Sequence, residues 1–175
     1  MNLEEHALKE RLANIKMLVM DVDGTMTDGS MYYSKEGDVA KRFYVRDGMG
    51  VQLVQAANIR TVIITSEATL IVEPRAKKLG IHHVIVGCKN KSSALKDLVR
   101  KEGIELRQVA YIGDDINDEA AMRLVGVACA PSDAHPIILE IAHLVLPSPG
   151  GRGAIRDLCD HILIAQGLPI TYKEH

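Results

Sequence analysis

Short runs of apolar, mostly β-branched residues alternate along this chain with longer segments of helical periodicity. Strands that are apolar throughout, instead of at every second position, are expected where helices cover both faces of a parallel sheet. The β-α-β-α order therefore predicts an α/β fold with a doubly wound parallel sheet. The expected strands are residues 17–20, 61–65, 83–86, 109–112 and 127–130, with a weaker one at 143–146.

The segments between these runs predict helices, and a further helix is expected near each end of the chain. The expected helices are residues 3–13, 49–57, 70–79, 92–102, 118–125 and 154–166. No repeat or Pro/Ser-rich linker interrupts the 175 residues, so we expect residues 1–175 to form a single domain.

One segment departs from the β-α rhythm just after the first expected strand. Residues 30–34 and 39–45 favour extended structure and flank Lys35-Glu36-Gly37-Asp38, which has the chemistry of a glycine-containing turn. This pattern predicts a β-hairpin inserted at about residues 30–45.

Composition excludes several classes of protein. The net charge of −2 gives no basic surface for nucleic acid or an anionic membrane, and no apolar run is long enough to span a bilayer. The first ten residues lack the apolar stretch of a signal peptide. The three cysteines are widely spaced and form no CxxC pair, so we expect reduced thiols and a cytoplasmic protein.

The first expected strand ends in Asp21-Val22-Asp23-Gly24-Thr25. Ligands of open α/β sheets bind beyond the carboxyl ends of the strands, where this motif falls. Side chains two apart in extended backbone point the same way, so Asp21 and Asp23 can face one site. Gly24 lets the backbone turn closely around a bound group, and Thr25 offers an N–H and a hydroxyl.

A second acidic motif, Gly113-Asp114-Asp115-Ile116-Asn117-Asp118, follows the fourth strong strand. Taken singly, an Asp-x-Asp motif is usually a solvated turn, and Gly113-Asp114-Asp115 could begin a helix as its N-cap. Both motifs after apolar strands instead favour a carboxylate cluster at one edge of the sheet. A hard divalent cation such as Mg²⁺ would relieve the repulsion within that cluster.

In these motifs the sequence resembles the haloacid dehalogenase superfamily of phosphotransferases, over almost the whole chain. Thr65, closing Ile63-Ile64-Thr65, and Lys91 match its other two motifs. The resemblance implies a Rossmann-like core in which Asp21 is the nucleophile and Asp23 the general acid, then base. Thr65 and Lys91 would hold phosphoryl oxygens. The Mg²⁺ ligands would be the Asp21 carboxylate, the Asp23 carbonyl and Asp114.

Most members of that superfamily carry a cap domain, and here the gaps after the first and third motifs are too short for one. The motifs Phe43-Tyr44-Val45-Arg46-Asp47-Gly48 and Gly150-Gly151-Arg152-Gly153-Ala154 resemble the capless 3-deoxy-D-manno-octulosonate 8-phosphate phosphatase family. That family implies a phosphorylated sugar acid as substrate. It also implies a homotetramer, with the hairpin and the glycine-rich C-terminal segment at subunit contacts. The candidate phosphate or substrate contacts are Gly24, Thr25, Arg46, Asp47, Gly48, Ser66, Glu67, Arg75 and Asp118.

Ser66-Glu67 departs from the Gly-Arg usual after the second motif of the octulosonate enzymes. An acid there resembles the branch that acts on nine-carbon nonulosonate 9-phosphates, where it can pair with Arg75. We therefore expect a nine-carbon substrate, with the octulosonate 8-phosphate as the alternative. A non-catalytic assembly module of the same fold is the alternative from another class, but it would be expected to lose Asp21 or Asp114.

Overall fold

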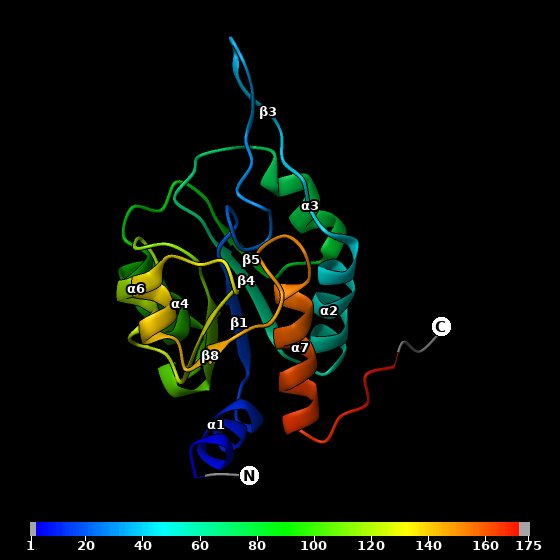
Figure 1. The fold of residues 1–175 in the computed structure, drawn as a ribbon, viewed down its shortest axis with the longest axis vertical. Coiled ribbons are helices and arrows are strands. Elements are labelled where there is room, and N and C mark those ends of the chain that lie inside the picture. Colours follow the sequence, from blue (N-terminus) through cyan, green and yellow to red (C-terminus); the bar gives the residue numbers. More distant parts are fainter. Residues whose placement is uncertain (1–2, 172–175) are drawn as a thin grey trace.

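A six-stranded parallel sheet forms the centre of the protein in a computed structural model that describes residues 3–171 (Figure 1). The strand order is β5-β4-β1-β6-β7-β8, and each neighbouring pair is parallel. The strands are β1 (Met17–Met20), β4 (Arg60–Ile64), β5 (His83–Ile85), β6 (Val109–Ile112), β7 (Val127–Ala130) and β8 (Leu144–Val145). The predicted doubly wound α/β fold is confirmed.

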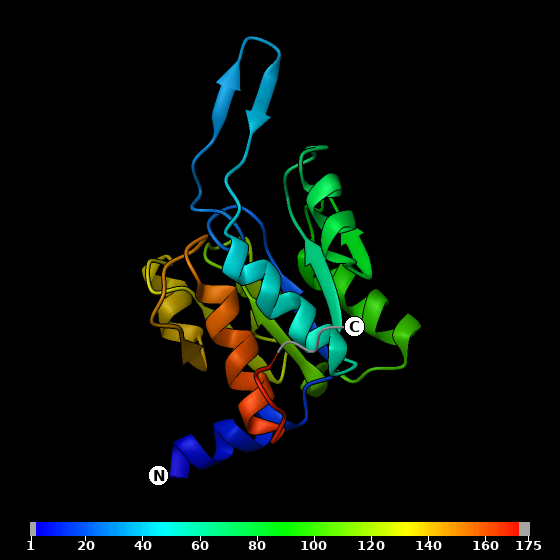
Figure 2. The same cartoon turned by 90° about the vertical axis from the view of Figure 1, so that its right-hand side faces the viewer.

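Helices cover both faces of this sheet (Figures 1 and 2). One face packs against α1 (Leu3–Ala13), α2 (Val45–Ala56), α3 (Val72–Leu79) and α7 (Ala154–Ala165). The other packs against α4 (Lys91–Glu102), α5 (Glu119–Met122) and α6 (Pro136–Ile141), while a 3-10 turn, η1 (Leu106–Gln108), precedes β6. None of these helices has the length and apolarity needed to cross a membrane.

Strand β1 shows why the apolar runs do not alternate. Leu18 and Met20 point into the core beneath α2 and α7, whereas Met17 and Val19 point into the core beneath α4 and α5. All four side chains are fully buried. Both faces of the strand therefore need apolar residues, as expected for a parallel sheet covered on both sides.

The order of the strands determines where a ligand can bind. From β1 the chain proceeds to β4 and β5 on one side, and then returns to β6 on the other side of β1. The direction of winding thus reverses between β1 and β6. Crevices at such a switch point, beyond the carboxyl ends of the strands, are the usual ligand sites of α/β sheets.

The predicted hairpin is present and projects from the body of the protein (Figures 1 and 2). Its antiparallel strands are β2 (Tyr32–Ser34) and β3 (Gly37–Ala40), joined by a two-residue turn instead of the expected four. The expectation that its second strand runs to residue 45 is wrong, because β3 ends at Ala40 and α2 begins at Val45.

Several helices differ from the prediction: α5 is half its expected length, α2 starts earlier than expected, and α6 is new. Helix α2 begins at Val45, four residues before the expected Met49. The sequence pattern placed its start too late because Gly48 and Gly50 weaken the helical signal there. Gly50 permits close packing against α7, since a Cβ at this position would lie 3.1 Å from Arg156 Cα. Helix α6 was not predicted. It has only six residues, and the His135 ring accepts a hydrogen bond from the N–H of Ile137 at its start.

Asp47 in the first turn of α2 caps a different helix, α7. Its Oδ1 accepts a hydrogen bond of 3.0 Å from the backbone N–H of Arg156, in the first turn of α7, while the N-cap residue Gly153 has no side chain to offer. Burial raises the pKa of Asp47 to about 6, partly offset by hydrogen bonds from the backbone of Arg156 and Gly153. Its other oxygen, Oδ2, is buried without a hydrogen-bond partner.

Asp47→Asn should therefore gain stability relative to the wild type as the pH rises. The pKa of Asp47 in the folded protein, about 6, lies above its ordinary value of 3.8, so ionisation of Asp47 between these two pH values opposes folding. Asn keeps an oxygen for the cap and never ionises. The free energy of unfolding is measured with urea for both proteins at about pH 4 and about pH 7.5. Relative to the wild type, the variant should be more stable at the higher pH than at the lower by roughly 1–3 kcal/mol. Asp97→Asn, on the exposed side of α4, is the control, and an equal difference at both pH values would contradict the assignment.

Candidate active site

Asp21 follows β1 directly and is buried at the carboxyl end of this central strand. Its backbone N–H donates to the carbonyl of Ile112 at 3.0 Å, which fixes it beside the end of β6. Lys91 Nζ lies 2.8 Å from Asp21 Oδ1 in an ion pair that lacks hydrogen-bond geometry. Among the described residues, this ammonium is the one group that pairs with the buried oxygen.

Asp118 fixes the position of Lys91. Its Oδ1 accepts hydrogen bonds from Lys91 Nζ and from the Tyr111 hydroxyl, each of 2.7 Å. Its Oδ2 accepts the backbone N–H of Asp114 at 3.2 Å, so one carboxylate shapes the whole loop after β6. Burial opposes the charge of Lys91, but Asp21 and Asp118 outweigh it and raise the lysine pKa. Lys91 therefore stays protonated between the two carboxylates.

Asp114 joins the loop after β6 to the loop after β1. Its Oδ1 accepts a hydrogen bond of 3.1 Å from the Thr25 hydroxyl. Gly24 lies beneath the carboxylate, with φ +85, and a Cβ there would lie 2.0 Å from Asp114 Oδ2. Only glycine fits both this backbone conformation and this close approach.

Three carboxylates meet at this point with a single buried ammonium group to offset them. Oxygens of Asp21, Asp114 and Asp118 lie within 4.8 Å of one another. Burial and the charge of Asp118 raise the pKa of Asp21 to about 7, against the opposing effect of Lys91. Burial and the charge of Asp21 likewise raise the pKa of Asp114 to about 7. This excess of negative charge fits a hard divalent cation.

A cavity of about 140 Å³ opens above the cluster. Thr65 follows β4 at its edge, and its hydroxyl accepts the backbone N–H of Glu67 at 3.3 Å. Asn117, which the sequence-based prediction missed as a site residue, donates to the Ser66 hydroxyl at 3.2 Å. The residues that line the cavity are Asp21, Asp23, Thr65, Ser66, Glu67, Asp114, Asp115 and Asn117.

Asp23 lines the same cavity, but its carboxylate turns away from the acidic cluster. Its Oδ1 pairs with the ammonium of Lys41, whose side chain is fully buried. The part of the Asp23 backbone carbonyl in the metal site stays a prediction. Lys41 was missed because Lys41-Arg42, after a hairpin strand, has the pattern of a solvated pair. Tyr111 was missed because it lies inside an apolar strand.

Four predicted substrate contacts lie away from the cavity within this chain. Arg46 is exposed on α2, and Asp47 caps α7. Arg75 donates to the Tyr44 carbonyl at 3.3 Å and lies over the Phe43 ring. Gly48 provides the space for its guanidinium, since a Cβ would lie 2.6 Å from Nη2. No ion pair joins Arg75 to Glu67 in the described part of the chain, and the substrate roles of all four residues stay predictions.

The glycine-rich segment at residues 150–153 packs against the loop that follows β1 of its own chain. The N–H of Gly151 donates to the Thr25 carbonyl at 2.9 Å. A Cβ at Gly150 would lie 1.8 Å from the carbonyl oxygen of Gly24, so the approach requires glycine. These contacts hold the loop of the site from within the chain. A contact of this segment with a neighbouring subunit stays a prediction.

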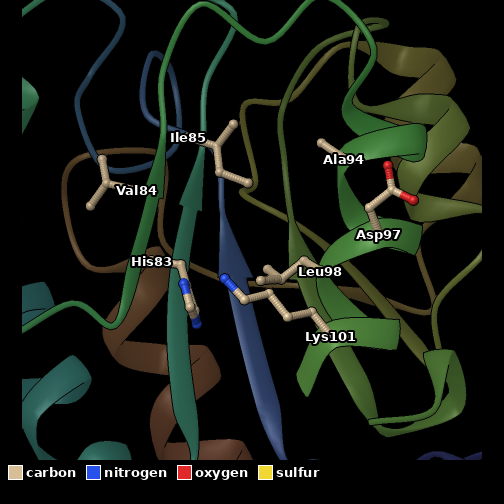
Figure 3. A pocket seen from close by; sticks show the side chains of 7 residues that line it. All are labelled: His83, Val84, Ile85, Ala94, Asp97, Leu98 and Lys101. Atoms are coloured by element: carbon tan, nitrogen blue, oxygen red, sulfur yellow. The ribbon is translucent and has the colours of Figure 1, made fainter. Parts of the chain in front are cut away.

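A wider hollow of about 370 Å³ lies between β5 and α4, at the outer edge of the sheet (Figure 3). Its lining is mostly apolar, with His83, Asp97 and Lys101 among the seven residues. The two carboxylate motifs and Lys91 are absent from it. The chemistry therefore belongs to the smaller cavity at the carboxyl ends of the strands.

Comparison with known proteins agrees with this geometry. Residues 77–155 match a family model described as haloacid dehalogenase-like hydrolase. The chain is 44% identical over 154 residues to 3-deoxy-D-manno-octulosonate 8-phosphate phosphatase of Salmonella typhi, covering 88% of this chain and 82% of the relative. The relative from Yersinia pestis is 44% identical over 157 residues, covering 90% of this chain and 84% of that one.

This chain belongs to the capless 3-deoxy-D-manno-octulosonate 8-phosphate phosphatase family of haloacid dehalogenase-like hydrolases. It is a phosphatase. A crystal structure of the Yersinia pestis enzyme has 43% identity and a TM-score of 0.90, covering 92% of this chain and 87% of that one. The structure of the Moraxella catarrhalis enzyme in complex with magnesium ion, phosphate ion and KDO has 38% identity and a TM-score of 0.90. It covers 95% of this chain and 94% of that one.

Removing one carboxylate should separate metal binding from folding. In the wild type, Mg²⁺ at about a hundredfold excess over its dissociation constant should raise the unfolding midpoint by about 5–10 °C, because it binds the folded cluster alone. Asp114→Asn should lose most of this rise, whereas Asp115→Asn, outside the trio of carboxylates, should keep it. The measurement is thermal denaturation with Mg²⁺ or with EDTA. An equal rise in Asp114→Asn would remove this residue from the metal site.

Proposed function

We propose that the protein hydrolyses 3-deoxy-D-manno-octulosonate 8-phosphate, with Mg²⁺ as cofactor and Asp21 as nucleophile. The supporting observation is the cavity lined by Asp21 and Asp23, in which Asp21 pairs with the protonated Lys91 at 2.8 Å. The relatives named for this substrate match 88–90% of the chain. They support the eight-carbon acid better than the nine-carbon substrate that Glu67 suggested from the sequence.

In the first half of the reaction, an Asp21 oxygen attacks the phosphorus atom and the bond to the sugar oxygen breaks. Asp23 gives its proton to that oxygen as it leaves. Lys91 and the Thr65 hydroxyl offset negative charge on the phosphoryl oxygens, which a carboxylate nucleophile cannot do for itself. A bound Mg²⁺, held by Asp21, Asp114 and the Asp23 carbonyl, would add further compensation of negative charge.

In the second half, a water molecule attacks the phosphorus of the aspartyl phosphate. Asp23, now ionised, takes a proton from the water, the bond between Asp21 and phosphorus breaks, and inorganic phosphate is released. Thr25 and Gly24 shape the turn beneath Asp114, and Asp118 fixes Lys91 and the loop after β6. These three residues act by holding the groups that contact the phosphate.

The cavity is too small for the whole substrate. About 140 Å³ accommodates a phosphoryl group, whereas pockets for larger ligands run to about 300–1,000 Å³. The sugar acid must extend beyond the cavity, under the hairpin, where Tyr33 lies within electrostatic reach of Glu67 and Asp23. In a chain without a cap domain, a second subunit is a natural cover for this open part.

We infer that residues 1–175 form one phosphatase domain that assembles into a homotetramer through its hairpins. The hairpin exposes Met31, Tyr32, Tyr33 and Val39, and an isolated two-stranded hairpin is marginal in water. We assign the protein to the cytoplasm, since Cys88, Cys129 and Cys159 are all free thiols.

A nine-carbon nonulosonate 9-phosphate is the second candidate substrate, and Glu67 is the observation that favours it. Glu67 lines the cavity, and no ion pair involves it among the described residues. A substrate with a donor at the matching position would satisfy this carboxylate, and a substrate without one would leave it unpaired. Such a mismatch costs about 1–3 kcal/mol, or roughly tenfold to a hundredfold in kcat/KM.

The substrate assignment predicts that wild type with Mg²⁺ has a kcat/KM at least about tenfold higher for the octulosonate 8-phosphate than for a nonulosonate 9-phosphate. Phosphate release from both sugars is the measurement. Asp21→Asn keeps the shape of the side chain, and it should lose several orders of magnitude in rate with either sugar. Near wild-type turnover by purified Asp21→Asn would refute the nucleophile.

Glu67→Arg distinguishes the two substrates further. Under the octulosonate proposal it should leave the eight-carbon reaction intact or improve it. A wild-type preference for the nine-carbon sugar that Glu67→Arg abolishes would replace the proposal with the second candidate. Hydrolysis of simple aryl phosphates should hardly change in this variant, because Asp21, Asp23 and Lys91 are untouched.

The assembly proposal predicts a tetramer in solution that depends on the hairpin. Multi-angle light scattering should give about four chains per particle for the wild type, in a closed assembly. Tyr32→Asp with Val39→Asp should give smaller particles, because charge replaces apolar contact between hairpins. Leu70→Asp, an exposed apolar residue outside the hairpin, is the control. A fully active wild-type monomer at assay concentration would contradict the proposal.

A further inference from the structure

Lys41 is a fully buried charged side chain next to the active site to which neither the sequence motifs nor the comparisons assign a role. It lies one residue after β3, at the base of the hairpin, and its side chain has no exposed surface. Its ammonium pairs with Asp23 Oδ1 and lies 3.8 Å from Asp38 Oδ2. A buried lysine is costly unless its charge is compensated, and one of its two carboxylate neighbours, Asp23, lines the cavity.

The two oxygens of Asp23 have different surroundings. Oδ1 is held by Lys41, whereas Oδ2 is buried and has no hydrogen-bond partner among the described residues. A carboxylate anchored through one oxygen has a fixed orientation, because rotation about its last bond would break the ion pair. The unpartnered Oδ2 is then the oxygen available for proton exchange in the cavity.

We propose that Lys41 is a positioning residue for catalysis: it anchors Asp23 through Oδ1 and thereby aims Oδ2 at the leaving oxygen of the substrate. This inference rests on the proposed acid–base role of Asp23. It goes further by assigning the hairpin a part in the chemistry. Lys41 itself touches neither the phosphate nor the sugar.

The anchor continues into the hairpin. Asp38 on β3 is the second carboxylate beside Lys41, and it lies opposite Tyr33 of β2 in the strand register. Asp38 is the main cause that raises the pKa of Tyr33. A row of polar contacts thus runs from the exposed hairpin through Asp38 and Lys41 to Asp23. The hairpin, which is the proposed subunit contact, thereby sets the orientation of the acid in its own chain.

The experiment compares phosphate esters that differ only in their need for an acid. A series of substituted phenyl phosphates, from weakly to strongly acidic leaving groups, is assayed by kcat/KM, which reports the step in which the leaving group departs. Lys41→Met should lose about tenfold to a hundredfold with the weakly acidic leaving groups, the range expected when a catalytic group is misplaced. With the most strongly acidic leaving group, kcat/KM should hardly change, since that oxygen needs no proton.

Matched variants isolate the cause. Lys35→Met removes an exposed lysine from the same hairpin and should leave the whole series unchanged. Lys41→Arg, which keeps the charge and the donors, should restore part of the loss. Adding Lys41→Met to Asp23→Asn should not increase the dependence of kcat/KM on leaving-group acidity any further, because Lys41 acts through Asp23. If Lys41→Met folds poorly, the double variant Lys41→Met with Asp38→Asn also removes a carboxylate left without its partner. This double variant should show the same larger loss of kcat/KM with weakly acidic leaving groups.

The outcomes separate this proposal from the assigned function. A uniform loss along the series with Lys41→Met, or no loss, would overturn the positioning role while leaving Asp23 as the acid. If Asp23→Asn loses no more kcat/KM with weakly acidic leaving groups than with strongly acidic ones, Asp23 is not the acid, and the proposal for Lys41 fails with it. Phosphatase activity through Asp21 and the choice of sugar are tested by other measurements and do not depend on the result for Lys41.

Discussion

Mutual repulsion among Asp21, Asp114 and Asp118 is the constraint on which the rest of the site depends. Their oxygens lie within 4.8 Å of one another, and Lys91 is the one ammonium group paired with them in the described part of the chain. Such a cluster opposes folding unless a cation or protons neutralise it. Burial first, and the charge of Asp118 second, raise the pKa of Asp21. The same property makes the site useful, because a group that compensates these carboxylates also compensates a phosphate. Stability and catalysis thus draw on one electrostatic arrangement.

The sheet topology brings these charges together. Asp21 follows β1 and Asp114 follows β6, and these parallel neighbours lie where the winding reverses. Glycines then permit contacts that other residues would block: Gly24 lies beneath Asp114, and Gly150 lies against the carbonyl of Gly24. The loop after β1, which begins with Asp21, is therefore held between the loop after β6 and the glycine-rich segment before α7. In this way a scaffold held by apolar packing presents a polar site without burying a loop whose backbone lacks partners.

The sequence predicted the parts of the site that follow strand ends, and it failed where tertiary contacts decide. Asp21, Asp114 and Thr65 were predictable because a parallel sheet aligns the carboxyl ends of its strands. Lys41 was not, since its partner Asp23 lies eighteen residues earlier and the hairpin fold alone brings them together. Arg75 illustrates the same limit, because its guanidinium lies over Phe43 and donates to a backbone carbonyl, contacts that the sequence pattern does not indicate. Patterns in the chain locate elements and their ends, whereas side-chain partners depend on the packing between elements.

The central claim is that catalysis passes through a phosphoryl group bonded to Asp21. Trapping that intermediate tests it most directly. Wild-type protein with Mg²⁺ and substrate would be quenched in acid within a single turnover, digested and examined by mass spectrometry. The account predicts that the peptide containing Asp21 gains the mass of one phosphoryl group, and that the Asp21→Asn peptide does not. A phosphoryl group found on another residue, or rapid turnover with no modified peptide at any quench time, would contradict the account.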